Sequence, residues 1–338
     1  MYASKLIPRN FGLVRRLATE VSKGQVIHQI RRNLTTNMYQ DKTKPEIVPN
    51  AIYIDPTYRC NRRCVGCYVD QRSGIIPVEL AEQASDYSLR KGVNYIAWLG
   101  GEPLLPKVRD IVIGLTLNFP RMSFNFCTNG DFLDKDLANR ISKLDNLVPF
   151  VSIDGLKKTH DWRRGKGSYD NAIKAMNLLK DRSRLFGYMS TVMPQNKDVV
   201  SSREFVDEMV DSGCMIGGYS LFLCGSVVSS IISPEEYWQF AGKLRDIARE
   251  FPLYILSTDF GYMGNGIVYR KSKRLIAVSV GPSGEVRTER GSIPIGNLSV
   301  NSLDDIISNE STQKIFKEKI IGTGGAERDP RLGILQNS

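Results

Sequence analysis

Short runs of apolar, β-branched and aromatic residues alternate with helix-period segments through the middle of the chain. The apolar runs lie at Ala51–Asp55, Tyr95–Leu99, Ser123–Thr128, Val148–Ile153, Phe186–Val192 and Ile216–Leu223. The helical segments between them lie at Pro77–Arg90, Lys107–Asn118, Asp134–Leu144, Tyr169–Lys180 and Arg203–Ser212. Because strand and helix alternate, the pattern predicts parallel βα units with helices on the outside. Six such units predict an α/β fold, a partial (β/α)6 barrel.

The pattern changes after residue 232. Ser233 and Glu236 predict a capped helix over Pro234–Glu250. A strand-like run at Leu275–Val280, a Gly-Pro-Ser-Gly turn and a second strand follow, before a helix near Ser302–Ile307. We therefore expect three parts: a basic N-terminal helix and linker (1–49), the barrel (50–232) and a small α+β extension (233–338).

The first 35 residues are rich in Arg and Lys and contain few acids. A transit peptide has this composition. However, Phe11, Val14, Leu17 and Val21 are spaced so that several share a face, which favours a basic amphipathic helix. Such a helix would pack on the barrel or make peripheral contact with an anionic membrane surface. No apolar run approaches the roughly 20 residues needed to cross a bilayer.

The net charge of +10 favours an anionic partner, which includes substrates, nucleic acids and membrane surfaces. No Lys/Arg run has the length of a nucleic-acid-binding arm, and the aromatic residues form no stacking motif. We therefore expect an anionic small-molecule substrate and no nucleic acid. The 338 residues and their ordinary apolar content indicate a folded protein rather than a disordered one.

Three of the six cysteines, Cys60, Cys64 and Cys67, lie within eight residues. This clustering in an enzyme-sized chain indicates a reduced, cytoplasmic compartment and a metal site. Thiolates suit both iron–sulfur clusters and zinc. A structural zinc site needs four ligands, and only three are close together here. Three thiolates on an iron–sulfur cube leave one iron open, as catalysis requires. The alternative is a non-catalytic module, with zinc completed by a distant Cys or His.

Other polar and glycine-rich segments follow the next three predicted strands. They are Gly100-Gly101-Glu102-Pro103, Thr128-Asn129-Gly130 and Asp154-Gly155. Each could be an ordinary turn. In βα barrels, however, the carboxyl ends of the strands meet at one rim, where the chemistry gathers. Five aromatic residues could line the pocket there or pack in the core, the commoner role: Tyr68, Trp98, Tyr188, Tyr219 and Tyr262.

The segment Cys60-Asn-Arg-Arg-Cys64-Val-Gly-Cys67 resembles the cysteine loop of the radical S-adenosylmethionine (SAM) superfamily. The resemblance covers about Ile52 to Leu223. It implies one [4Fe-4S] cluster whose open iron binds the amino and carboxylate groups of SAM. It also implies reductive cleavage of SAM to a 5′-deoxyadenosyl radical, oxygen sensitivity, and flavodoxin or ferredoxin as electron donor.

The resemblance also implies contacts with SAM. Gly100, Gly101, Glu102 and Pro103 correspond to the segment that accepts hydrogen bonds from the SAM amino group. Thr128 and Asn129 correspond to the third strand end, and Ser152 and Asp154 to a site near the ribose or carboxylate. Arg164 could pair with that carboxylate, because a guanidinium fits a carboxylate in bidentate fashion. This chain departs from the family in having Gly66 before the third cysteine, with Tyr68 after it as the candidate adenine contact.

The region Val280–Val286 and Ile295–Leu298 resembles the frame of a SPASM or twitch extension, which normally carries auxiliary clusters. Arg287, Thr288 and Glu289 stand where a cysteine is expected, and no cysteine follows Cys224. We therefore expect no auxiliary cluster, which favours redox-neutral chemistry. Cys224, at a strand end, is a candidate hydrogen donor, although a buried structural thiol is the commoner role.

Together these features predict a radical SAM enzyme that abstracts hydrogen from, or adds the adenosyl radical to, a small metabolite such as a nucleoside or sugar. A lipid substrate fits the basic N-terminal helix, and a peptide substrate fits the SPASM-like frame. The rival of another class is a non-catalytic iron–sulfur or zinc protein.

Overall fold

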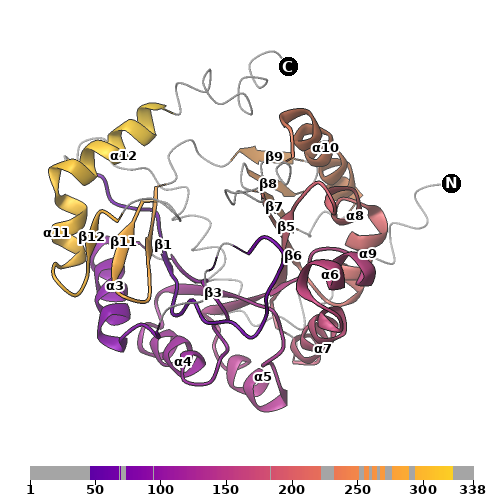
Figure 1. Ribbon diagram of the computed structural model, residues 1–338, viewed down its shortest axis with the longest axis horizontal. Helices are drawn as coiled ribbons and strands as arrows, with labels where there is room; N and C mark the ends of the chain where they lie inside the picture. Colours follow the sequence, from indigo (N-terminus) through magenta and orange to yellow (C-terminus); the bar gives the residue numbers. More distant parts are fainter. Residues whose placement is uncertain are drawn as a thin grey trace.

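A curved sheet surrounds the centre of the molecule, and helices cover its outer side (Figure 1). The computed structural model describes residues 46–67, 69, 74–93, 95–182, 184–221, 232–250, 255–258, 261–264, 267–270, 276–288 and 294–322. Six neighbouring parallel strands are β1 (Ala51–Ile54), β2 (Tyr95–Trp98), β3 (Ser123–Thr128), β4 (Leu147–Ser152), β5 (Gly187–Val192) and β6 (Ile216–Leu221). They match the six predicted runs and confirm the α/β fold with its partial barrel.

The predicted helices connect these strands. They are α3 (Val78–Lys91), α4 (Val108–Asn118), α5 (Lys135–Ile141), α7 (Ser168–Lys180) and α9 (Arg203–Asp211). Local chemistry sets several of their ends. Asp134 caps α5 by accepting from the Leu137 N–H at 2.7 Å, and Gly92 ends α3 in the left-handed conformation. Two short helices, α6 (Lys157–Arg164) and α8 (Lys197–Val200), were not predicted.

Side chains on the strands alternate between two faces. Ile52, Ile54 and Trp98 belong to the main core between sheet and helices. On the opposite face, Ala51, Tyr95 and Ala97 form a separate buried cluster. The outer face of β1 and β2 therefore carries the main core.

The aromatic residues that could have lined a pocket lie in the core where the structure describes their side chains. Trp98 stacks on Phe124, with ring centroids 6.2 Å apart. Tyr188 and Tyr219 join hydroxyl to hydroxyl at 2.5 Å and are buried. Tyr188 also packs edge-on against Phe205 of α9. Core packing is therefore the role of these three.

Strands from the region after residue 232 extend the same sheet at both edges. Beside β1 lie β10 (Ala277–Val280), β11 (Glu285–Arg287) and β12 (Gly296–Asn297), and beside β6 lie β7 (Ile255–Thr258), β8 (Gly261–Gly264) and β9 (Ile267–Arg270). β10 pairs with β1, and β7 with β6, in parallel. The division of the chain at residues 49 and 232 stays a prediction.

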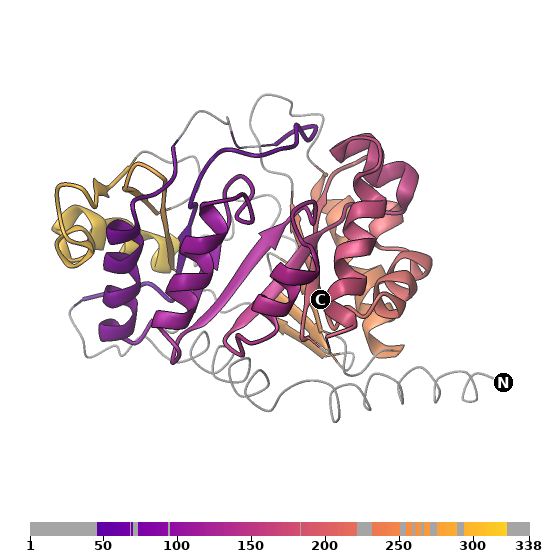
Figure 2. The ribbon, with the colours of Figure 1, turned by 90° about the horizontal axis from the view of Figure 1, so that it is seen from below.

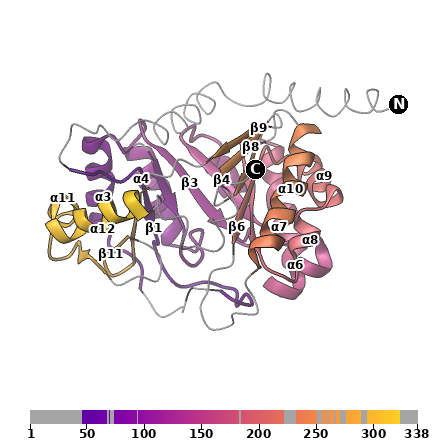
Figure 3. The same ribbon diagram turned by 90° about the horizontal axis from the view of Figure 1, so that it is seen from above.

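Three helices accompany these strands: α10 (Pro234–Glu250), α11 (Leu303–Ser308) and α12 (Glu310–Gly322). Figure 3 shows α11 and α12 near α3, with α10 at the other end of the sheet. The predicted cap of α10 is confirmed, because Ser233 N–H donates to Glu236 Oε2 at 2.7 Å and Glu236 N–H donates to Ser233 Oγ at 3.2 Å. No helix among the described residues is long and apolar enough to span a membrane.

Some predictions fall outside the described residues. These are the N-terminal basic helix and its membrane contact, Tyr68 as the adenine contact, and Cys224 as a hydrogen donor.

Candidate functional site

The loop after β1, which carries the three cysteines, crosses the carboxyl ends of the strands (Figure 2). The glycine pair after β2 fits closely under it. Gly101 N–H donates to the Thr57 carbonyl at 2.8 Å, and Glu102 N–H donates to the Arg59 carbonyl at 2.9 Å. A Cβ atom on Gly101 would lie 2.0 Å from the Arg59 carbonyl oxygen. Glycine is therefore required at 101 for the loop to pack on β2.

The three cysteines differ in their surroundings. Cys67 is exposed, whereas Cys60 and Cys64 are half-buried. The Cys60 sulfur accepts from the Arg62 N–H at 3.5 Å and from Asn129 Nδ2 at 3.8 Å. In the metal-free protein, burial raises the pKa of the Cys60 thiol to about 11, and the negative charges of Glu102, Cys64 and Cys67 act in the same direction. A cation bound at the loop would favour the thiolate form.

The ligand set fits an iron–sulfur cluster better than zinc. Among the described residues, no three Cys, His, Asp or Glu side chains are placed to hold a single metal ion. A zinc ion needs four ligands that converge on one point. Cluster thiolates each bind a different iron, so they flank a cube instead of converging. His160, one of the two histidines, is unsuited to zinc, because its Nδ1 accepts from the Asp154 N–H at 3.0 Å and the ring is buried.

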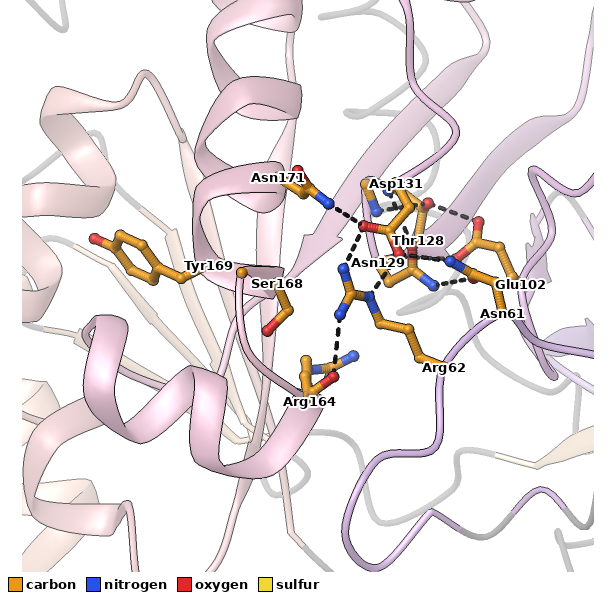
Figure 4. Close-up of polar contacts among 12 residues, drawn as sticks. Asn61, Arg62, Glu102, Thr128, Asn129, Asp131, Arg164, Ser168, Tyr169 and Asn171 are labelled. Atoms are coloured by element: carbon orange, nitrogen blue, oxygen red, sulfur yellow. Dashed lines mark hydrogen bonds and ion pairs between the residues drawn. The ribbon is translucent and has the colours of Figure 1, made fainter.

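Glu102 joins the ends of β2 and β3 (Figure 4). Its carboxylate accepts from Thr128 Oγ1 at 2.7 Å, the Asn129 N–H at 2.8 Å and the Leu104 N–H at 3.0 Å. Burial raises its pKa to about 7, and these hydrogen bonds oppose the rise. The observed role of Glu102 and Thr128 is to fix the rim. The SAM contacts predicted for Gly100, Gly101, Glu102, Pro103, Thr128 and Asn129 stay predictions.

Asp154 lies fully buried at the end of β4 and binds two arginines of α6. Its Oδ2 accepts from Arg163 Nη1 at 2.6 Å and from Arg164 Nε at 2.5 Å. Its Oδ1 accepts from the Thr191 N–H, at the end of β5, at 2.8 Å. Burial alone would raise the pKa of Asp154, but the two guanidinium groups outweigh it and hold this pKa well below its usual range.

The SAM carboxylate is the predicted partner of Arg164, and in this structure Arg164 Nε donates to Asp154 Oδ2. The guanidinium still lies close enough to Cys64 and Cys67 to interact with their charges. Ser152, half-buried, points to the inner face of β4, opposite Met189 of β5 in the register. The roles of Ser152, Asp154 and Arg164 toward SAM stay predictions.

Arg62 and Asp131 belong to the site but were not predicted from the sequence. Arg62 lies between the first two cysteines, and its guanidinium forms a bidentate ion pair with Asp131, which follows the Thr-Asn-Gly turn after β3. The available signal was the charge of the two residues: Asp131 directly follows a predicted turn at the rim, and Arg62 lies in the cysteine loop. Neither residue belongs to a segment with helical or strand periodicity, so the sequence did not pair them.

Comparison with known proteins gives the family. Residues 54–206 match the Radical SAM superfamily. Fe-coproporphyrin III synthase from Methanosarcina barkeri is 26% identical over 231 residues, which cover 64% of this chain and 56% of that protein. Pre-heme d1 synthase from Dinoroseobacter shibae is 29% identical over 161 residues, which cover 46% of this chain and 38% of that protein. The chain thus spans little more than half of the first relative and less than half of the second.

Solved structures share the fold. Streptococcus suis SuiB bound to S-adenosylmethionine has a TM-score of 0.66 and is 16% identical, and the match covers 86% of this chain and 77% of that chain. At this identity the likeness concerns the fold alone. The family match begins in β1 and extends into α9, so residues 54–206, with the cysteine loop and the rim, form a Radical SAM domain.

Proposed function

We propose that this chain holds one [4Fe-4S] cluster on Cys60, Cys64 and Cys67 and uses it to cleave SAM reductively. The observation that carries the proposal is the loop of three neighbouring cysteines, which crosses the carboxyl ends of the strands within the region that matches the Radical SAM superfamily. When bound, the cluster supplies one electron to the sulfonium of SAM, which yields a 5′-deoxyadenosyl radical. A flavodoxin or ferredoxin would donate that electron.

The chain's own residues would bind and orient SAM. The backbone after β2, from Gly100 to Pro103, would accept hydrogen bonds from its amino group. Arg164 would offer its guanidinium to the SAM carboxylate, because it lies beside the cysteine loop and its ion pair with Asp154 holds it in place. Ser152 and Thr191 lie at the ends of β4 and β5, where a ribose could be bound.

For the substrate we propose an anionic small metabolite, such as a nucleotide or a sugar acid. Support comes from the net charge of +10. The first relative named above is a synthase of a small molecule, Fe-coproporphyrin III. The radical would abstract hydrogen from the substrate or add to it, and the expected lack of an auxiliary cluster favours a redox-neutral outcome.

Anaerobic reconstitution with iron and sulfide tests the proposal. The protein should turn brown, bind about four irons per chain, and release 5′-deoxyadenosine when reduced with dithionite in the presence of SAM. Replacing Cys60, Cys64 or Cys67 by Ala should abolish both iron binding and SAM cleavage. Cys214→Ala is the matched control, because this buried thiol lies in the core. Zinc in place of iron, or a brown protein that never cleaves SAM, would show that the non-catalytic alternative is right.

A further inference from the structure

The cysteine loop is attached to the rim by one of its own side chains, Arg62. Its Nε donates to Asp131 Oδ2 at 2.6 Å and its Nη2 donates to Asp131 Oδ1 at 2.5 Å (Figure 4). The two side chains are only 13% and 12% exposed. The remaining nitrogen, Nη1, donates to the Arg164 carbonyl at 3.1 Å. One guanidinium therefore joins the loop to the turn after β3 and to the end of α6.

The Asp131 carboxylate is saturated by donors from three residues in two segments, the cysteine loop and α7. Besides Arg62, it accepts from Asn61 Nδ2 at 2.5 Å and from Asn171 Nδ2 of α7 at 2.8 Å. Four donors fill the hydrogen-bonding capacity of a carboxylate. Asn61 and Arg62 are adjacent and both lie between Cys60 and Cys64. A single carboxylate thus fixes the path of the chain between two of the thiolates.

Further contacts hold the loop from the side of α6. Val65 N–H donates to the Arg163 carbonyl at 2.8 Å. The side chains of Arg163 and Arg164 are both bound to the buried Asp154. Helix α6 is therefore anchored to β4 through its side chains, and it holds the loop through its carbonyl groups. All of these contacts are between protein atoms.

We propose that Arg62 and Asp131 are positioning residues that set the spacing of Cys60 and Cys64 before iron is bound. The inference rests on the proposed function and deepens it. Many metal sites form only as the metal binds, so that ordering the loop reduces the affinity. Here hydrogen bonds between protein atoms order the loop between Cys60 and Cys64, so that less ordering remains to be done when the cluster binds. Neither Arg62 nor Asp131 is a ligand, and both act through the cysteines.

Iron retention in matched variants tests this inference. Arg62→Ala and Asp131→Ala should each weaken cluster binding by about 10- to 100-fold, the usual effect of removing a residue that orients metal ligands. Because the two residues act as a unit, the double variant should lose no more than either single one. Arg62→Lys keeps the charge but loses the bidentate geometry, so it should lie between Ala and wild type. Arg63→Ala, at an exposed position of the same loop, is the control and should match wild type.

The readouts separate positioning from folding and from charge. Iron transfer to a chelator is measured anaerobically at a temperature where circular dichroism shows every variant to be folded, and reduced clusters are compared by electron paramagnetic resonance. Faster iron loss and a broadened signal in both single variants support the inference. Unchanged iron loss would overturn it. If Arg62→Ala then lowered the cluster potential and Asp131→Ala raised it, the pair would act by charge alone. If wild-type protein binds no cluster, the proposed function itself fails.

Discussion

At the scale of single residues, the site is built from carboxylates held in unusual surroundings. Glu102 and Asp154 are both buried, yet only the pKa of Glu102 ends above its usual value. Asp154 faces two guanidinium groups, whereas Glu102 is bound by neutral donors only. Neutral hydrogen bonds do not outweigh the loss of water around Glu102, so its proton remains bound up to about pH 7.

This difference gives a prediction for stability against pH. The pKa of Glu102 rises from 4.5 to about 7 on folding, so its contribution to stability is present below pH 4.5 and is lost as pH rises to 7. The loss amounts to about 3 kcal/mol at about 1.4 kcal/mol per pKa unit. Urea unfolding of iron-free wild type and Glu102→Gln at pH 5 and pH 8 measures it.

The variant Glu102→Gln should lack this pH-dependent term, although it should be less stable at pH 5, because its amide faces the Asn129 N–H. Equal pH dependence in the two proteins would contradict the assigned pKa.

At this scale the sequence singles out residues whose chemistry is local. The cysteines stand out by their spacing, and the Gly-Gly-Glu segment and the Thr-Asn-Gly turn stand out because each directly follows a predicted strand. The ion pair of Arg62 with Asp131 does not, since it joins two loops that are distant in sequence and neither loop has a period. Likewise, Trp98 was ambiguous until the register of β2 placed it on the outer face.

At the scale of elements, the end of β2 and the cysteine loop form one unit. The strands and most helices of the barrel were predictable, because β-branched runs and helical periodicity mark them to within a few residues. Helices α6 and α8 were missed. Lys157–Arg164 contains a single large apolar residue, Trp162, and that residue is exposed. Its helix is stabilised by charges bound to Asp154 rather than by an apolar face.

Two glycines give a matched prediction for this unit. In Gly101→Ala the new methyl group would meet the Arg59 carbonyl, so the loop must move. We expect a loss of about 1–3 kcal/mol in unfolding free energy and a marked loss of bound iron. Gly114→Ala, in α4 with no atom within 4 Å of the added group, should instead stabilise by about 0.5–1 kcal/mol. Chemical unfolding and iron analysis of both variants check this, and normal iron content in Gly101→Ala would refute the close packing.

At the scale of the whole molecule, the sheet continues past the barrel on both sides. β1, which leads into the cysteine loop, pairs with β2 on one side and with β10 on the other. Tyr58, two residues before Cys60, donates a hydrogen bond to Glu285 Oε1 at 3.2 Å. This arrangement was beyond sequence-based prediction, because strand partners so distant along the chain leave no local pattern.

The proposed iron site should therefore depend on residues well outside the matched region 54–206. Val278 of β10 is fully buried and lies opposite Ile52 of β1. Val278→Asp buries an unpaired charge and should cost about 3–5 kcal/mol, with loss of bound iron at moderate temperature. Val300→Asp, at a position 79% exposed, should leave both unchanged. Thermal melts and iron analysis of both variants check this prediction. A normal cluster in Val278→Asp would show that cluster binding does not depend on β10.

The parallel pairing of β1 with β10 also orders events during synthesis. The ribosome delivers the three cysteines long before β10, the strand that pairs with β1. If the cluster proposed above requires this pairing, iron and sulfide can be retained only after β10 has been translated and has joined the sheet.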